Sequence, residues 1–235
     1  MGVVVRTPRI TAEDLACSDA ERCDEARHPV AIETPPPHTG LLGILLPWKD
    51  GLSLKTGATG LSQLSAFIGI SRDRSAASNR VDIDGEGNPV IHYRVTSADK
   101  PMLLAGLEMS LRMLRASGAK GVFYTHTTAP WYFSNAENDE EAFEKYIATM
   151  KKEGLAVHKM QVFSAHQMSS CRMASSPEEG PVSPTGELYE CKNLFVADGS
   201  VLPTSLGINP MITIEAFAHM IAKKVVLRLQ SLKQQ

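Results

Sequence analysis

Apolar and β-branched residues gather in short runs along the chain, and such runs are typical of β-strands. The runs occur at residues 30–32, 64–70, 81–84, 90–95, 121–125, 160–163 and 194–197. Between two of them lies the turn segment Gly-Glu-Gly-Asn-Pro at 85–89. Turn residues between two strand-like runs predict a β-hairpin.

Two internal segments carry helix signals. In residues 101–117, apolar side chains recur on one helical face, and Gly118 suits the end of that helix. Asn138 and Glu141 resemble a capping box, which predicts a second helix ending at Gly154.

A third helix is predicted after Asn209 and Pro210, because Asn at the N-cap followed by Pro at the first helical position favours a helix start. The predicted order of elements along the chain is therefore a series of strands, two helices, one strand and a terminal helix. This order predicts an α+β fold with a largely antiparallel sheet and flanking helices, and it disfavours alternating βαβ units.

Composition excludes several classes of protein. The 235 residues suffice for one large domain or two small ones. The net charge of −2 argues against a nucleic-acid-binding surface. The four cysteines form no CxxC pair, so no metal site is expected and a reducing, intracellular compartment is favoured. No apolar run approaches the roughly 20 residues of a membrane-spanning helix, and Arg6, Pro8 and Arg9 interrupt the first ten residues, so no signal peptide is visible.

Candidate chemistry lies between His166 and the third predicted helix. An imidazole can exchange protons near pH 7, and a helix start directs backbone N–H groups and positive potential at a ligand. Each residue also has a structural reading: His166 as a hydrogen-bonded turn residue, Asn209 as an N-cap, and Asp198-Gly199 as a turn that ends a strand. The sequence holds no G-x-S-x-G, which disfavours a serine hydrolase of the elbow type.

Two motifs carry a family resemblance. They are H-Q-M-S-S-C-R-M at 166–173 and V-A-D-G-S-V-L-P-T-S-L-G-I-N-P-M-I-T-I at 196–214. Both resemble the C-terminal part of the glucose–methanol–choline (GMC) oxidoreductases, flavoenzymes that oxidise alcohols. Within that family the chain looks most like the long-chain fatty alcohol oxidases, and cholesterol oxidases come next. The resemblance covers most of residues 30–230, including Arg72-Asp73-Arg74.

The resemblance implies a role for each site residue. His166 falls on the catalytic histidine, and Asn209 falls on its partner. The contacts to FAD fall on the residues Asp198, Gly199, Asn209, Pro210 and Met211. It also implies a poorly defined lead-in at 1–29, a substrate-binding domain with the catalytic His turn at 30–192, and the last strand and helix of an incomplete FAD-binding domain at 193–235.

The resemblance implies flavin-dependent oxidation of an alcohol to an aldehyde, and the likeness to long-chain fatty alcohol oxidases implies a long-chain primary alcohol as the substrate. The chain has no G-x-G-x-x-G unit to hold the FAD pyrophosphate; Gly85-x-Gly87 precedes a strand and does not qualify. The chain is therefore expected to be the C-terminal portion of an enzyme whose FAD-binding segment lies elsewhere. The alternative is a non-catalytic remnant that serves as a binding or interaction module. The basic face of the last helix has two interpretations: it could associate with a membrane surface without a spanning segment, or it could simply be exposed to solvent.

Overall fold

The computed structural model describes most of the chain and groups it into two compact units. The described residues are 5–6, 30–35, 40, 43, 45–46, 48, 50–74, 78–127, 131–134 and 139–233. Unit 1 comprises Met1–Ser71 and Ser97–Phe163, and unit 2 comprises Arg72–Thr96 and Ser164–Gln235. Predictions for residues 11–29 and for Asn138 lie outside the described residues.

Unit 1 contains a three-stranded antiparallel sheet in the order β1 (Val5–Arg6), β2 (Ala31–Glu33), β3 (Ile68–Ile70). The strand predicted at 30–32 is thus confirmed. The strand predicted at 64–70 is confirmed only in its last three residues, because the 3-10 turn η1 (Leu61–Gln63) precedes it. β1 was not predicted.

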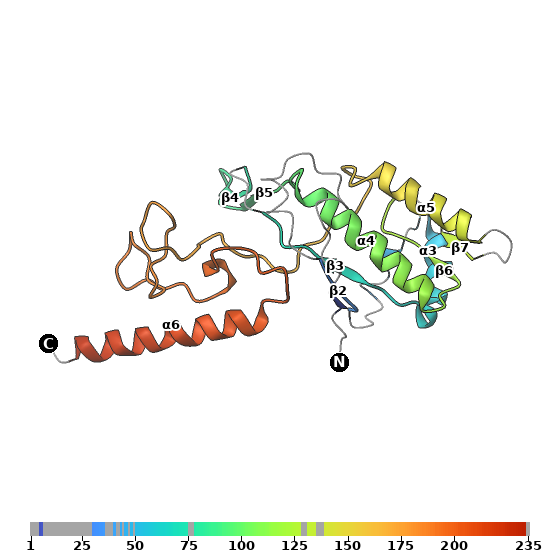
Figure 1. Cartoon of the computed structure of the whole chain (residues 1–235). Helices are drawn as coiled ribbons and strands as arrows, with labels where there is room; N and C mark the ends of the chain where they lie inside the picture. Colours follow the sequence, from blue (N-terminus) through green and yellow to red (C-terminus); the bar gives the residue numbers. More distant parts are fainter. Residues whose placement is uncertain are drawn as a thin grey trace, which may run out of the picture. The chain divides into compact units, whose positions relative to one another are not determined.

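The helix α4 (Asp99–Ala116) packs on this sheet (Figure 1). It approaches closely because Gly106 has no side chain: a Cβ there would lie 2.7 Å from Cγ1 of the buried Val30. Its apolar face also meets α5 (Asp139–Glu153), which runs beside it. α4 was predicted from its periodicity and its end signal, and α5 from its end signals alone. Gly118 has the positive φ of +91° that the end of α4 requires.

The main core of unit 1 lies between these helices and a small antiparallel sheet of β6 (Gly121–Val122) and β7 (Tyr132–Phe133). Aromatic rings form much of it, with Tyr132 and Phe143 5.4 Å apart between ring centroids. The buried members are Leu111, Val122, Tyr124, Phe143, Tyr146, Ile147 and Met150.

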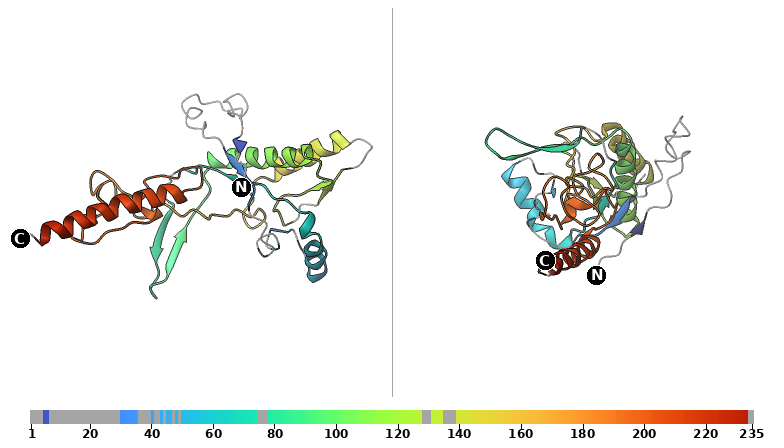
Figure 2. Two further views of the ribbon diagram at one scale, coloured as in Figure 1. Left: turned by 90° about the horizontal axis from the view of Figure 1, so that it is seen from below. Right: turned by 90° about the vertical axis from the view of Figure 1, so that its left-hand side faces the viewer.

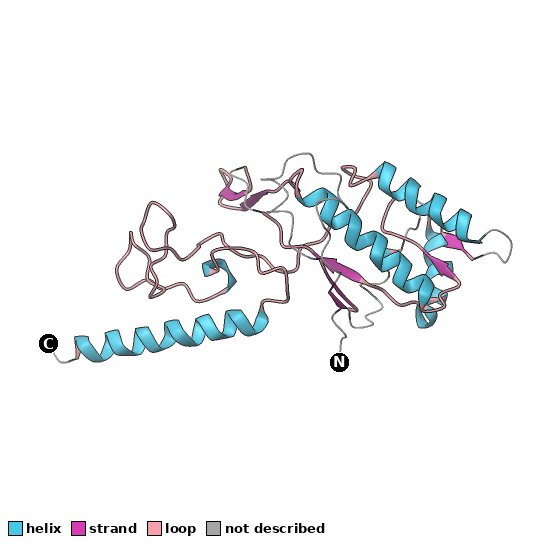
Figure 3. Cartoon of the chain, in the orientation of Figure 1, coloured by secondary structure: helices cyan, strands magenta, loops and turns pink. Residues whose placement is uncertain are grey.

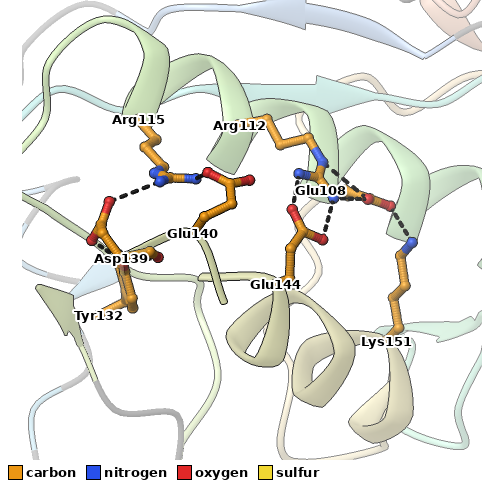
Figure 4. A network of polar contacts seen from close by, with 8 residues as sticks. All are labelled: Glu108, Arg112, Arg115, Tyr132, Asp139, Glu140, Glu144 and Lys151. Carbon is orange, nitrogen blue, oxygen red and sulfur yellow. Dashed lines mark hydrogen bonds and ion pairs between the residues drawn. The ribbon is translucent and has the colours of Figure 1, made fainter. Parts of the chain in front are cut away.

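A network of ion pairs joins α4 to α5 at the edge of this core (Figure 4). Arg112 donates from Nη1 to Glu144 Oε1 at 2.5 Å and from Nη2 to Glu108 Oε1 at 2.9 Å. Lys151 of α5 pairs with the other Glu108 oxygen at 2.6 Å. The remaining members are Arg115, Tyr132, Asp139 and Glu140.

One further helix of unit 1, α3 (Gly51–Thr59), was not predicted. A reciprocal capping box starts it: the Ser53 N–H donates to Asp50 Oδ1 at 2.7 Å, and the Asp50 N–H donates to Ser53 Oγ at 3.0 Å. The sequence Gly51–Thr59 has no apolar stripe that would indicate a helix, and no residue of α3 is buried.

Unit 2 begins with the predicted hairpin, β4 (Arg80–Ile83) and β5 (Pro89–His92). Figure 2 (left) shows the two strands side by side as a ribbon. Asp84 builds the turn, because its Oδ1 accepts hydrogen bonds from the N–H groups of Glu86 and Asn88. All strand pairs that form sheets in the described residues are antiparallel, as predicted for the α+β class.

The rest of unit 2 is mostly loop, followed by the long helix α6 (Met211–Leu232) (Figure 3). The loop is held by scattered backbone bonds and one 3-10 turn, η2 (Gly199–Val201). Val182, Val201 and Ile221 form the buried core that links the loop to α6.

Two predicted strands are wrong. Residues 194–197 form only the single bridge Glu187↔Phe195, made by the bonds from the Val196 N–H to the Gly186 carbonyl and from the Leu188 N–H to the Leu194 carbonyl. Residues 160–163 likewise form the single bridge His126↔Met160. The compact units also divide the chain at other positions than the predicted domains 30–192 and 193–235, which stay a prediction.

Candidate active site

His166 stands, half-buried, at the start of a loop that runs beside η2. Two backbone bonds fix this neighbourhood: the Cys171 N–H donates to the Ser200 carbonyl at 3.1 Å, and the Met173 N–H donates to the Val201 carbonyl at 2.8 Å. The motif that carries the imidazole is therefore tied directly to the Asp-Gly-Ser motif.

The turn after His166 uses an uncommon backbone conformation. Ser169 has φ +70°, in the left-handed region that residues with a Cβ rarely adopt. Such a conformation costs free energy and persists only where the surrounding structure imposes it. Here it occurs between His166 and Cys171, whose N–H is bonded to the Ser200 carbonyl.

Asp198 caps the short turn η2. Its Oδ1 accepts the Ser200 N–H at 2.7 Å. Hydrogen bonds from the Ser200 side chain and from its N–H lower the pKa of the Asp198 carboxyl below its ordinary value. Asp198 is accordingly an ionised, structurally engaged carboxylate at neutral pH.

Gly199 is the point where the three predicted segments meet. A Cβ at this position would lie 3.2 Å from the carbonyl oxygen of Gln167, next to His166, and 3.1 Å from Cδ1 of Ile214, in the first turn of α6. A side chain there would fit only if these neighbours shifted by a few tenths of an ångström. The structure therefore brings the His166 turn, the Asp198-Gly199 turn and the start of α6 together.

The predicted start of α6 is displaced by one residue. The helix begins at Met211, and the buried Pro210 occupies the N-cap position with helical φ and ψ of −87° and −5°. The N-cap position of α6 therefore differs by one residue from the predicted Asn209. A proline before the first helical residue reaches helical angles itself, because its ring fixes φ. Asn209 is exposed on the approach to the helix.

The loop before Asn209 contacts Arg72, the first residue of the charged segment Arg72-Asp73-Arg74. Arg72 Nε donates to the carbonyl oxygen of Ser205 at 2.9 Å, in a partly buried bond. Gly207 has φ +64°, and a Cβ there would lie only 2.7 Å from Cβ of Arg72. These partners are far apart in sequence, so no local signal could have indicated the contact.

The other ionisable groups suggest no competing site. His126 is buried in unit 1, with its Nδ1 3.8 Å from Glu153 Oε2. Within the described ranges, no three His, Cys, Asp or Glu side chains are grouped to hold a metal ion. The search for a helix able to cross a membrane, made over the same residues, found none.

Comparison with known proteins decides the family. A family model described as GMC oxidoreductase matches residues 75–218, which include both motifs. The chain belongs to the GMC oxidoreductase family. The resemblance read from the two motifs is thereby confirmed.

Long-chain-alcohol oxidases are among the relatives of this GMC chain. It is 34% identical over 197 residues to long-chain-alcohol oxidase FAO4A of Arabidopsis thaliana, covering 84% of this chain and 26% of that protein. It is 33% identical over 227 residues to FAO3 of the same plant, covering 95% of this chain and 28% of that protein. The chain thus spans about a quarter of the length of these relatives.

Two further matches are more limited. A cholesterol oxidase of Acinetobacter baumannii is 50% identical over 57 residues, which cover 24% of this GMC chain and 10% of that protein. The crystal structure of a pyridoxine 4-oxidase from Mesorbium loti has 19% identity and a TM-score of 0.39, over 68% of this chain and 29% of that one.

The residues at this site suit only part of a flavin. Asp198 and Gly199 lie beside the start of α6, where the first-turn N–H groups point away from the helix and favour an anionic group. With Pro210 and Met211 at the helix start, these are the residues of the site that could hold part of a flavin. The Gly-rich loop that would hold the pyrophosphate is absent from the sequence.

Proposed function

We propose that this chain supplies the catalytic His turn and substrate side of a flavin-dependent alcohol oxidoreductase. The observation that carries the proposal is the convergence at Gly199, where Gln167 and Ile214 approach from either side. Convergence of the His166 turn and the α6 start is what a site using His166 and Asn209 requires. The relatives named long-chain-alcohol oxidases support a long-chain primary alcohol as the substrate.

Oxidation of an alcohol removes the hydroxyl proton and the hydrogen on the adjacent carbon. A neutral imidazole is a suitable acceptor for the hydroxyl proton near pH 7, and we assign this step to His166. The carboxamide of Asn209 would donate a hydrogen bond to the substrate oxygen and orient it. FAD, when bound, would accept the hydride.

The start of α6 has a supporting role in this proposal. Its 22 residues, Met211–Leu232, align their peptide dipoles with the positive end at Pro210. Preorganised N–H groups at such an end stabilise negative charge without reorganising. Asp198, whose carboxylate is held by Ser200, would fix the turn against which the helix start packs.

The test compares His166→Ala with the unchanged chain, each combined with FAD and the flavin-binding segment of a long-chain-alcohol oxidase. We expect the turnover of a long-chain primary alcohol to fall by about 10²–10⁴-fold, the usual contribution of a general base. His219→Ala is the matched control, because His219 is exposed on α6. Equal turnover by His166→Ala and the unchanged chain would remove His166 from its role.

A second candidate is a binding or interaction module without activity. It is favoured by large apolar side chains that unit 2 leaves exposed, such as Ile83 (75%) and Ile91 (70%) on one face of the hairpin. Exposed apolar groups of this kind mark interaction surfaces. Flavin absorbance separates the candidates: a purified chain that stays colourless with FAD and with the flavin-binding segment would favour the module.

A further inference from the structure

We propose that Arg72 is the positioning residue of this site: it holds the 205–207 loop and thereby sets the place of Asn209. The inference rests on the proposed function for the role of Asn209. The contact itself stands on geometry within unit 2, so it can be tested separately.

The first observation is the hydrogen bond from Arg72 Nε to the Ser205 carbonyl, 2.9 Å long and partly buried. A charged donor makes a stronger bond than a neutral one, and partial burial reduces competition from water. This bond joins residues 133 positions apart, so it is a tertiary tie and not part of a local turn.

The second observation is the close fit of Gly207 against the same side chain. A Cβ at Gly207 would lie 2.7 Å from Cβ and 3.4 Å from Cα of Arg72, and φ there is +64°. The loop is therefore bonded to Arg72 at Ser205 and pressed on it at Gly207. We call these three residues the Arg72 clamp.

The segment that carries Arg72 is itself held by hydrogen bonds to the hairpin. The next residue, Asp73, accepts a hydrogen bond from Tyr93 Oη at 3.2 Å, and the Asn79 side chain donates to the Arg94 carbonyl at 3.1 Å. These bonds join Asp73 and Asn79, which precede β4, to Tyr93 and Arg94, which follow β5, so they tie the two ends of the hairpin together. The arginine is thus held by the hairpin, and the loop is held by the arginine.

Asn209 lies between the clamp and α6. One residue separates it from Gly207, and on its other side the buried Pro210 accepts a hydrogen bond from the Ile214 N–H at 2.8 Å. With both ends fixed, the backbone of Asn209 has little freedom. Release of the clamp would free one end and leave the helix intact.

The first test measures backbone ¹⁵N order parameters of residues 206–209 in the 235-residue chain. We expect values near about 0.85 in the unchanged chain and below about 0.6 in Arg72→Ala, the range of a flexible segment. Arg72→Lys, which keeps a charged N–H donor, should restore much of the order. Arg74→Ala is the control, because it removes the same charge from the same short segment.

Unchanged order parameters in Arg72→Ala would overturn the proposal. An equal fall in the order parameters of Leu188 and Val196 would also overturn it, since that would indicate a general loosening of unit 2. If Arg72→Ala does not fold, Gly207→Ala takes its place: it pushes the loop off Arg72 and should loosen the same residues, and no loosening there would also overturn the clamp.

The second test places Arg72→Ala in the flavin-loaded assay described above. We expect kcat to fall about tenfold or more with a smaller change in KM, and the loss should be absent when Asn209→Ala is already present. Losses that multiply in the double variant would overturn a role through Asn209. If the unchanged chain oxidises no alcohol, the proposed function fails, and the order parameters still decide whether Arg72 positions the loop.

Discussion

Single backbone positions decide how closely the segments of the site approach one another. Gly199 and Gly207 each stand where a Cβ would strike a neighbouring segment, at 3.1 Å and 2.7 Å. Ser169, by contrast, carries a Cβ at a φ of +70° that glycine would adopt with less strain. The site therefore contains one residue whose conformation is imposed by the bonds on either side of it.

Ser169→Gly is expected to stabilise the chain. Glycine removes the strain of the left-handed conformation but adds freedom to the unfolded chain, so the net gain is about 0.5–1 kcal/mol in the free energy of unfolding. Urea unfolding of the purified chain measures this gain. The control is Ser170→Gly, next to it, where no positive φ exists and a loss of similar size is expected. A lower free energy of unfolding for Ser169→Gly would show that the Ser169 side chain contributes more to stability than its backbone strain costs.

At the scale of elements, ion pairs add pH dependence to the contact of α4 with α5. Arg112 joins the two helices by donating to both carboxylate oxygens of Glu144, at 2.5 Å and 2.9 Å. The hydrogen bond from Arg112 is the main reason why the pKa of Glu144 lies below its ordinary value of 4.5. A lowered pKa in the folded state means that the pairing contributes stability above the unfolded pKa and that this contribution is lost as pH falls through the folded value.

Glu144→Gln should therefore reduce the acid sensitivity of unit 1. Above the ordinary carboxyl pKa of 4.5 the variant is expected to be less stable than the unchanged chain, and the difference should shrink as pH falls from there through the lowered pKa of Glu144. Unfolding midpoints measured from pH 7 to pH 3 give the comparison. Glu141→Gln, on the same helix, serves as the control. A constant difference across the range would contradict the assignment.

The elements predicted correctly are those whose signals are local. The periodicity of α4 and the turn at 85–89 can be read from a few neighbouring residues, and both elements formed as expected. The run at 194–197 has an equally apolar sequence but no strand, because its bonding partners are single loop residues. Apolar runs predict burial better than they predict a ladder, since a ladder depends on a partner elsewhere in the chain.

The site could be predicted in part for the same reason. Motifs around His166 and Asn209 were visible, and their segments do converge at Gly199. The tie from Arg72 to Ser205 was not predictable, since neither residue has a pattern that points to the other. Charged residues in a polar stretch are usually solvated, and only the folded chain shows which one is not.

At the scale of the whole molecule, the described residues form two core clusters of different size. Unit 1 buries seven residues in its aromatic core, and the core of unit 2 rests on three, with Ile221 of α6 among them. Both tryptophans, Trp48 and Trp131, belong to unit 1, whereas α6 belongs to unit 2. Tryptophan fluorescence therefore reports on unit 1 alone, and helical circular dichroism reports on both units.

Ile221→Ala is expected to destabilise unit 2 selectively. Its side chain is 1% exposed and fills the space beside Gly186, where a Cβ would lie 2.6 Å away, so truncation leaves a cavity that costs about 2–5 kcal/mol. In urea, the circular dichroism transition should gain an earlier phase while the fluorescence midpoint stays unchanged. Met150→Ala, in the core of unit 1, should shift the fluorescence midpoint instead. Because separate cores unfold separately unless their interface couples them, a fluorescence midpoint that moves equally in both variants would show one cooperative molecule.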